Sequence, residues 1–553
     1  MKRTAETEGA ERPEQEGDRW LVGFLAGAAA LVGLRARADF LVDDAFISFR
    51  YARSWWESGV PVFNSFELAD GGQPVEGFSN ALWTGLLALV HGAGFDLVAA
   101  TPWIQLVCAL LVVLLVARAA AALDLGTAAR IGAPVLTATA APFVAWSQGG
   151  METTLFTALL ALLFIGVTAE PRREERLLLC AAVIGAVGTT WVRVEGFAWV
   201  MGTALAAAVA MRATGGAPRG AAPRLAAAVA MAAAALALQL LLRRAVFGEW
   251  LPNTVAAKTG VDQGVLTARG LRYVASWALV ALTPLFATLA LLPALKHPRV
   301  PARRTALAGA GVAIGFAVYC VAVGGDWMPF FRFLAPAAPV LALVVAIGAD
   351  RMAAPLGPLL LISAAATQPL ALLDVHVAPK AAREALRFRG FEGGYRTEAK
   401  RVEAARTNLE YVAPLGRALA AATEPGDVLA YGAIGAVGWY APALDLLDRN
   451  GLVTPEVARA PASAGGTAGH DKRVPHSWFL DHGTPSARYL FATWVAAAPP
   501  AVTPEVRARL AEAVRRQRQV NGPEEAQLFE RTAMRIVPFP AEGRTLILLE
   551  REP

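Results

Sequence analysis

Apolar runs of membrane-spanning length constrain the fold of this chain more than any other feature. Between residues 20 and 374, only 43 of 355 residues are Asp, Glu, Lys or Arg, whereas residues 375–553 hold 43 in 179. A soluble domain keeps about a quarter of its residues charged, so residues 20–374 cannot form a soluble globular unit. We therefore predict a polytopic α-helical membrane protein, with a lipid bilayer around residues 20–374.

Twelve apolar runs are candidates for crossing the bilayer. We expect the run at 79–95, which contains His91, Gly92 and Gly94, to lie at the interface or to re-enter. The other eleven are expected to cross: 20–34, 101–117, 131–146, 151–169, 177–192, 196–211, 225–242, 273–294, 305–323, 333–349 and 355–373. The first run could instead be a signal peptide, but the long, acid-rich segment before it favours an anchor helix.

Positive charge gives the orientation. If 79–95 does not cross, one set of alternate loops carries 17 Lys and Arg in 68 residues, and the other carries 10 in 92. By the positive-inside rule the richer set is cytoplasmic. We therefore expect a protein of the cytoplasmic (inner) membrane with a cytoplasmic tail (1–19), a transmembrane domain (20–374) with a first outer loop (35–78), and an extracytoplasmic domain (375–553).

This topology gathers polar and aromatic side chains on the outer side of the membrane domain. Acids at or near membrane depth are costly and usually serve a site. Six acids are on this side: Asp43, Asp44, Glu76, Glu152, Glu195 and Asp326. The accompanying substrate-binding candidates are Arg50, Tyr51, Asn80, Arg193, Asn253, Lys258, Trp327 and Arg332.

Structural roles are the alternative for several of these residues. Asp43 and Asp44 can cap a helix in contact with solvent. Glu152 and Glu195 fit acids favoured at helix starts by the helix dipole, and Glu195 can pair with Arg193. Arginine and lysine side chains in these loops can also reach lipid headgroups.

The combined set suits chemistry on a lipid-linked sugar phosphate. A carboxylate can act as general base on a hydroxyl, and Arg or Lys can stabilise a phosphate leaving group. Aromatic side chains stack on sugars, and grooves between helices accommodate a lipid chain. The sequence has no P-loop, kinase signature or zinc-type Cys/His cluster. Its net charge of +6 follows from membrane topology, so no nucleic-acid partner is expected.

Three motifs carry a resemblance to a known superfamily. They are Asp43-Asp44-Ala45-Phe46-Ile47-Ser48-Phe49-Arg50-Tyr51, Val75-Glu76-Gly77-Phe78-Ser79-Asn80 and Gly150-Met151-Glu152-Thr153. Together they resemble the GT-C superfamily of membrane glycosyltransferases. With the C-terminal segments 435–440 and 444–452, the sequence is similar to the terminal β-(1→2) arabinofuranosyltransferases of mycobacterial and corynebacterial cell walls.

The resemblance implies a GT-C-like fold and an inverting transfer on the outer face of the membrane. The donor would be a polyprenyl-phosphate sugar, with arabinofuranose as the sugar of the similar group, and the acceptor a cell-envelope glycan. It also implies a catalytic base at Asp43 or Asp44, with a slight preference for Asp43. Some GT-C enzymes use a divalent metal, which the acids here permit without requiring it.

The polar C-terminal domain is predicted to be a small α/β domain. Helices are expected at 381–386, 396–419 and 504–519, and strands at 427–431, 488–493, 535–538 and 545–549. Residues 460–477 are rich in Gly, Ala and Ser at their start, which is typical of a loop. We expect this loop to lie over the membrane site, with Lys472, Arg473 and His476 in contact with acceptor or phosphate, or else to be an exposed linker.

Two other functions compete with sugar transfer. A lipid or glycan transporter or flippase predicts an internal repeat and acids near the middle of its spans, but the sequence has no evident repeat and its acids lie at span ends. A sensor or scaffold that binds glycan without chemistry predicts that Asp43 and Asp44 are dispensable.

Overall fold

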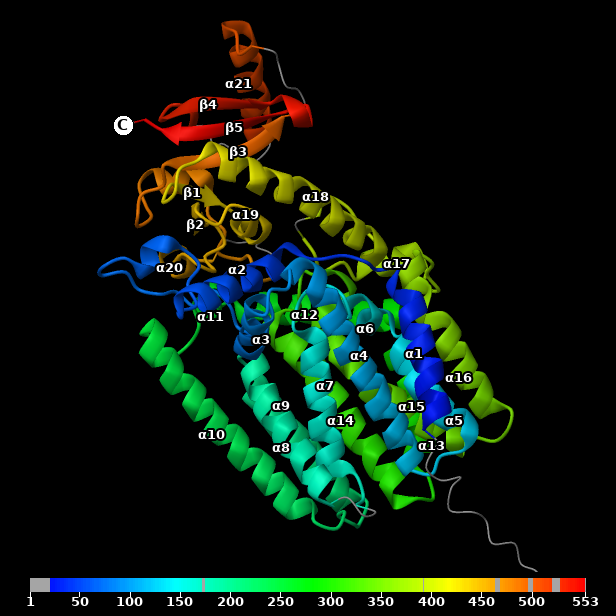
Figure 1. Cartoon of the computed structure of the whole chain (residues 1–553). Coiled ribbons are helices and arrows are strands. Elements are labelled where there is room, and N and C mark those ends of the chain that lie inside the picture. Colours follow the sequence, from blue (N-terminus) through cyan, green and yellow to red (C-terminus); the bar gives the residue numbers. More distant parts are fainter. Residues whose placement is uncertain are drawn as a thin grey trace, which may run out of the picture.

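A helical bundle carries a small sheet with its own helices at one end (Figure 1). The computed structural model describes residues 20–171, 175–390, 392–462, 468–495, 501–519 and 528–552. The tail expected at 1–19 lies outside these residues.

Seven helices among the described residues are long and apolar enough to cross a membrane. They are α4 (Leu97–Ala122), α8 (Glu175–Val192), α9 (Gly196–Ala213), α10 (Ala221–Phe247), α14 (Val300–Val323), η3 (Pro329–Ala337) with α15 (Ala338–Arg351), and α16 (Leu356–Thr367) with η4 (Gln368–Leu373). Large apolar side chains such as Trp103, Leu205 and Leu241 point outward from them. The chain is therefore a multi-pass membrane protein.

Three shorter apolar helices accompany these spans: α1 (Leu21–Arg35), α3 (Ala81–Gly92) and α7 (Thr153–Thr168). Helices α1 and α7 coincide with runs expected to cross. Helix α3 has 12 residues, which gives about 18 Å at the usual rise of an α-helix. That is well short of a hydrocarbon core of about 30 Å, in line with the expectation that 79–95 does not cross.

Two of the runs predicted to cross are each broken into two helices. Helices α12 (Gln263–Ala281) and α13 (Thr283–Leu295) bend by 83° at Leu282, which has a φ of 60°. Helices α5 (Thr127–Thr139) and α6 (Ala141–Trp146) are interrupted at Ala140. In both cases a proline starts the second helix, Pro284 and Pro142. Proline has no N–H to donate into the preceding turn, so it begins a helix well and interrupts one.

The first loop forms α2 (Asp43–Ser58), η2 (Ser65–Leu68) and a return to α3. Helix α2 lies between the bundle and the C-terminal elements (Figure 1). Its acids fall in the first turn, where the helix dipole favours them, and Ala45 to Ala52 are buried. It packs against α19 (Ile434–Tyr440) at Gly435. A Cβ on Gly435 would lie 1.9 Å from the carbonyl oxygen of Asp43, so only glycine permits this approach.

The C-terminal region contains a five-stranded sheet in the order β2-β1-β3-β5-β4. The four strands predicted from the sequence are confirmed as β1 (Val428–Tyr431), β3 (Tyr489–Val495), β4 (Thr532–Phe539) and β5 (Arg544–Arg551). Strand β2 (Asp445–Asp448), parallel to β1, was not anticipated. The predicted helices are α17 (Lys380–Ala385), α18 (Glu398–Ala422) and α21 (Pro504–Gln519), and α20 (Pro455–Ala458) and η5 (His476–Leu480) complete the connections.

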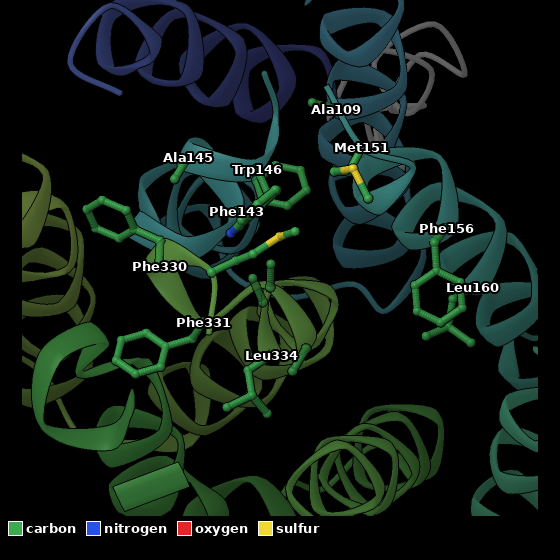
Figure 2. Packing of buried hydrophobic residues seen from close by; sticks show 14 of the residues in the cluster. Ala109, Phe143, Ala145, Trp146, Met151, Phe156, Leu160, Phe330, Phe331 and Leu334 are labelled. Atoms are coloured by element: carbon green, nitrogen blue, oxygen red, sulfur yellow. The ribbon is translucent and has the colours of Figure 1, made fainter. Parts of the chain in front are cut away.

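The turn at η3 is the strained part of the core. Phe330 and Phe331 both have a φ of 50°. Figure 2 shows Phe330 near Ala145, and the ring of Phe331 packs against those of Tyr273 and Phe388, with centroids 5.4 and 6.1 Å away. The indole of Trp146 donates to the carbonyl of Pro329 at 2.9 Å. The backbone N–H of Phe330 donates to Glu398 at 2.7 Å. Packing and hydrogen bonds therefore hold a conformation that these residues would otherwise avoid.

Candidate active site

A cavity of about 530 Å³ lies where the first loop, the ends of several helices and the C-terminal region meet. Nine of the seventeen residues predicted for the site line it: Asp44, Asn80, Glu152, Arg193, Glu195, Lys258, Asp326, Trp327 and Arg332. They come from six separate segments of the chain, so the fold brings together residues that lie far apart in the sequence.

The adjacent acids at the start of α2 have different surroundings. Asp44 lines the cavity, whereas the carboxylate of Asp43 accepts hydrogen bonds from the backbone N–H groups of Gly435 at 3.1 Å and Ala436 at 2.8 Å. Asp43 therefore caps α19, and only Asp44 faces the space that a substrate would occupy.

Burial raises the pKa of both acids. The pKa of Asp43 rises to about 6, because burial and the charge of Asp44 outweigh the hydrogen bonds from Ala436 and Gly435. Burial also raises the pKa of Asp44, against the nearby charges of Arg332 and Lys258. A carboxyl with a raised pKa is a stronger base once it has lost its proton.

Glu152, Arg193 and Glu195 form a closed network on one wall. The guanidinium of Arg193 donates to Glu152 at 2.8 Å and to Glu195 at 2.6 Å. Asn80 donates to the other oxygen of Glu152 at 3.0 Å, and Tyr319 donates to Glu195 at 3.1 Å. The expected alternative of pairing between Glu195 and Arg193 is thus present within the cavity wall.

The segment before α15 supplies a second ion pair. Gly324 and Gly325 have φ values of 78° and 75°, which lets the chain turn sharply after α14. The guanidinium of Arg332 then donates to Asp326 at 2.8 Å, and Trp327 between them lines the cavity.

Lys258 ends the short helix α11 (Asn253–Lys258) and lines the cavity. Among the described residues, no ion pair to it is present. Burial, followed by the charge of Arg332, lowers its pKa. Asn253 holds the start of α11: its N–H donates to the carbonyl of Glu76 at 3.0 Å, and its amide donates to the carbonyls of Gly451 and Leu452 at 2.7 and 2.9 Å.

The other predicted site residues lie outside the lining: Asp43, Arg50, Tyr51, Glu76, Asn253, Lys472, Arg473 and His476.

Several of these residues make internal contacts instead. Arg50 donates to the carbonyls of Phe63, Gly438 and Leu444, Tyr51 donates to Val75, and Glu76 pairs with Arg243. The ammonium of Lys472 donates to Ala256 and Ala458. His476 contacts the carbonyl of Leu490, and Arg473 is exposed.

Sequence reasoning missed several residues of the cavity: Ser48, Arg269, Tyr319, His470 and Asp471. Arg269 and Asp471 pair across the cavity mouth at 3.1 Å. Tyr319 could have been identified from the sequence, because it is a polar side chain within an apolar run. His470 and Asp471 precede the predicted Lys472 directly. In the predicted loop, His470 and Asp471 line the cavity, whereas 463–467 lie outside the described residues. The contact of this loop with acceptor or phosphate stays a prediction.

A divalent metal was left open by the sequence. Within the described parts of the chain, no group of three or more His, Cys, Asp or Glu side chains could hold a metal ion. The charges that act most strongly on Asp44, after burial, are the cations Arg332 and Lys258. The residues present therefore do not fit a metal held by protein ligands, and the chemistry below uses none.

Comparison with known proteins gives the fold. The structure is similar to a crystal structure of ArnT from Cupriavidus metallidurans bound to undecaprenyl phosphate, with a TM-score of 0.51 and 14% identity over 96% of this chain and 98% of ArnT. The apo state of ArnT gives a TM-score of 0.51 and 13% identity over 96% and 97%. ArnT is a GT-C glycosyltransferase, and the similarity spans nearly all of both chains. This chain has the GT-C fold.

Other comparisons are less extensive. Residues 399–520 match a family described as a domain of unknown function, DUF8728. A cryo-EM structure of the mycobacterial arabinofuranosyltransferase AftD gives a TM-score of 0.41 and 19% identity over 78% of this chain and 32% of AftD. No curated protein matches the sequence. Within the GT-C fold of this chain, the cavity lies at the end of the bundle that carries the C-terminal sheet (Figure 1).

Proposed function

We propose that this protein is an inverting glycosyltransferase that moves a sugar from a polyprenyl-phosphate donor to a cell-envelope glycan. The reaction would take place on the outer face of the cytoplasmic membrane. The GT-C fold supports the proposal, as does the undecaprenyl phosphate bound to ArnT, which shares that fold. Arabinofuranose is our first candidate for the sugar, because the sequence motifs resemble arabinofuranosyltransferases.

One observation carries the proposal: a carboxylate and an ammonium group, neither with an ion-pair partner among the described residues, face the same cavity. Arg193, Arg332 and Arg269 each have an acidic partner within 3.1 Å. Among the described residues, neither Asp44 nor Lys258 has an ion-pair partner. Asp44 is half-buried and Lys258 is exposed, and both line the cavity, so both are accessible to a substrate.

The reaction follows from this arrangement. The carboxylate of Asp44 takes the proton from an acceptor hydroxyl, whose oxygen attacks the anomeric carbon of the donor sugar. The bond between that carbon and the phosphate oxygen breaks as the new glycosidic bond forms on the opposite face. Polyprenyl phosphate leaves with the bonding electrons, and Lys258 stabilises the charge that develops on it. The protein contributes a positioned base and a preorganised cation.

A second cavity offers a site for the acceptor. It has a volume of about 850 Å³ and adjoins the first cavity at Val255 and Thr259, which line both. Trp250, Asp70 and Glu456 are among its lining residues. An aromatic ring with carboxylates suits a neutral glycan, since the carboxylates accept hydrogen bonds from hydroxyls and would repel a phosphate.

Transfer from purified donors tests the proposal. Purified protein in detergent would be incubated with a panel of radiolabelled polyprenyl-phosphate sugars, arabinofuranose included, and crude cell-wall glycan. We expect product from one donor, lost in Asp44→Asn and retained in Asp481→Asn. Asp481 is an exposed acid paired with Arg531 and serves as the matched control. If folded wild-type protein yielded no product from any donor, the transporter and scaffold functions would take precedence.

The orientation is proposed from the loop charges and needs its own test. We expect a reporter fused after Asp374 to read extracytoplasmic, together with the sheet region that follows. A cytoplasmic signal at that position would overturn the orientation and with it the outer-face reaction.

A further inference from the structure

The C-terminal region contributes part of the cavity wall through Ala468, Gly469, His470 and Asp471. Two contacts fasten this segment. Asp471 pairs with Arg269 of α12 at 3.1 Å. The neighbouring Lys472 donates to the carbonyls of Ala256 in α11 at 2.9 Å and Ala458 in α20 at 2.7 Å. The backbone around His470 is thus held to three elements, α11, α12 and α20.

The imidazole of His470 has an unusual environment. Its ring centroid lies 5.3 Å from that of Trp327, with an angle of 64° between the planes. Its Nδ1 is buried and has no hydrogen-bond partner among the described residues. Burial, followed by the charges of Lys258 and Arg473, lowers the pKa of His470 to about 4, against the weaker effects of Asp326 and Asp471. The ring is therefore neutral at pH 7.

We infer that His470 is a specificity-determining residue that hydrogen-bonds a hydroxyl of the transferred sugar, with the indole of Trp327 bordering the same sugar. The inference rests on the proposed function. A buried polar atom without a partner is costly, and a ligand that fills the cavity can satisfy it. A hydroxyl both donates and accepts, so it fits either tautomer of the ring.

The charge distribution favours a sugar hydroxyl over the phosphate as the partner. A neutral imidazole adds no positive charge for a phosphate, and Lys258 already supplies a free cation beside it. The Cβ position of Gly469 lies 3.9 Å from Trp327 and 4.0 Å from Lys258, so the segment spans from the aromatic ring to the cation. A sugar attached to a phosphate at Lys258 would meet His470 next.

Two substitutions at His470 and one control separate the hydrogen bond from packing. His470→Phe keeps a ring against Trp327 and removes the nitrogen. His470→Asn restores a polar group near the position of Nδ1. The control is His482→Phe, since His482 stacks on Trp478 at 4.3 Å and is exposed outside the cavity. The measurements are the KM for polyprenyl-phospho-arabinofuranose and the inhibition constant of sugar-free polyprenyl phosphate.

We expect His470→Phe to raise the KM of the sugar donor about tenfold, the usual effect of losing one buried hydrogen bond. The inhibition constant of polyprenyl phosphate should stay unchanged, His470→Asn should recover part of the loss, and His482→Phe should match wild type. Equal changes in both constants would assign His470 to the phosphate and overturn the inference. An unchanged donor KM, or a change confined to the acceptor KM, would also overturn it.

The inference can be judged even if the proposed function fails. In that case wild-type protein transfers no sugar, and binding is read instead as thermal stabilisation by the same two lipids. Tighter binding of the sugar-bearing lipid than of polyprenyl phosphate, lost in His470→Phe, supports the contact. The same preference in wild type and His470→Phe contradicts it.

Discussion

Two clusters of charged side chains meet at η3, and they differ in how completely the charges are paired. In the first, Glu398 accepts hydrogen bonds from Arg389 and Arg401, and Arg401 also pairs with Glu392. All four side chains are at least 92% buried, and every charge has an opposite partner. In the second, around the cavity, Asp44 and Lys258 have no such partner among the described residues. We take complete pairing as the property of a cluster that supports the fold, and we propose that the incompletely paired cluster binds a ligand.

The sharpest way to break this comparison is to neutralise the free acid. Asp44→Asn removes the base without changing the size of the side chain. We expect transfer to fall by about a thousandfold, within the range that general-base catalysis contributes, while the melting temperature is kept or raised, since a desolvated carboxylate is gone. Retained activity would mean that another group takes the proton.

Removal of the free cation should have the next largest effect. We expect Lys258→Met to reduce kcat about a hundredfold, because one preorganised charge on the leaving phosphate is lost. Lys258→Arg should restore part of the rate. A variant with normal kcat would mean that Arg193 or Arg332 alone neutralises the phosphate.

The fully paired cluster around Glu398 should respond in the opposite way, with a loss of stability and little loss of activity. Glu398→Gln leaves Arg389 and Arg401 buried with too little negative charge, which costs about 3 kcal/mol of unfolding free energy by the behaviour of broken buried pairs. We expect a clear fall in melting temperature, with transfer per folded molecule reduced less than tenfold. The comparison would fail if stability were unchanged and transfer were lost as fully as in Asp44→Asn.

Asp43 provides a further test, because it is adjacent to Asp44 but its carboxylate accepts hydrogen bonds from the start of α19. Asp43→Asn keeps an oxygen that accepts from Ala436, so we expect less than a tenfold loss of transfer. An equal loss in Asp43→Asn and Asp44→Asn would undo the distinction between cap and base. In that case the double variant would have the same transfer rate as either single variant, which can be measured as kcat with the same donor.

The smallest expected effect is a shift of the pH profile. Asp44 must be deprotonated to act, and burial raises its pKa, so the acid limb of kcat should lie above the usual aspartate range near 4. Transfer is then lost as the pH falls through that raised value. In Lys258→Met the nearby cation that opposes the shift is missing, so the limb should move to still higher pH. A limb that moved downward would contradict the coupling.

The sequence predicted the bundle well, because the bilayer imposes long apolar runs that are visible without a structure. It could not predict that 273–294 bends by 83°, since Pro284 only marks a helix start and does not give an angle. In the C-terminal region, strand β2 begins and ends with aspartate and has only two apolar residues between them. That pattern is too short for the usual alternation of a strand.

For the site, residue types were easier to predict than roles. The strings around Asp44, Glu152, Glu195 and Asp326 stood out because charge is rare in the membrane domain. Which of two adjacent acids faces the cavity depends on α19, almost 400 residues further along the chain. The role of Asn253 likewise depends on carbonyls near residue 451 that no local pattern indicates.

The contacts of Asn253 also set an order in time. Asn253 of helix α11 joins the first loop, through its backbone N–H on Glu76, to Gly451 and Leu452, which accept from its side-chain amide. A ribosome delivers these three pieces one after another, and the last arrives with four-fifths of the chain already made. Helices can enter the bilayer as they emerge, but the mouth of the cavity closes only afterwards. Nascent chains should therefore be inserted and yet inert, and truncation before residue 452 should leave a bundle without a working site.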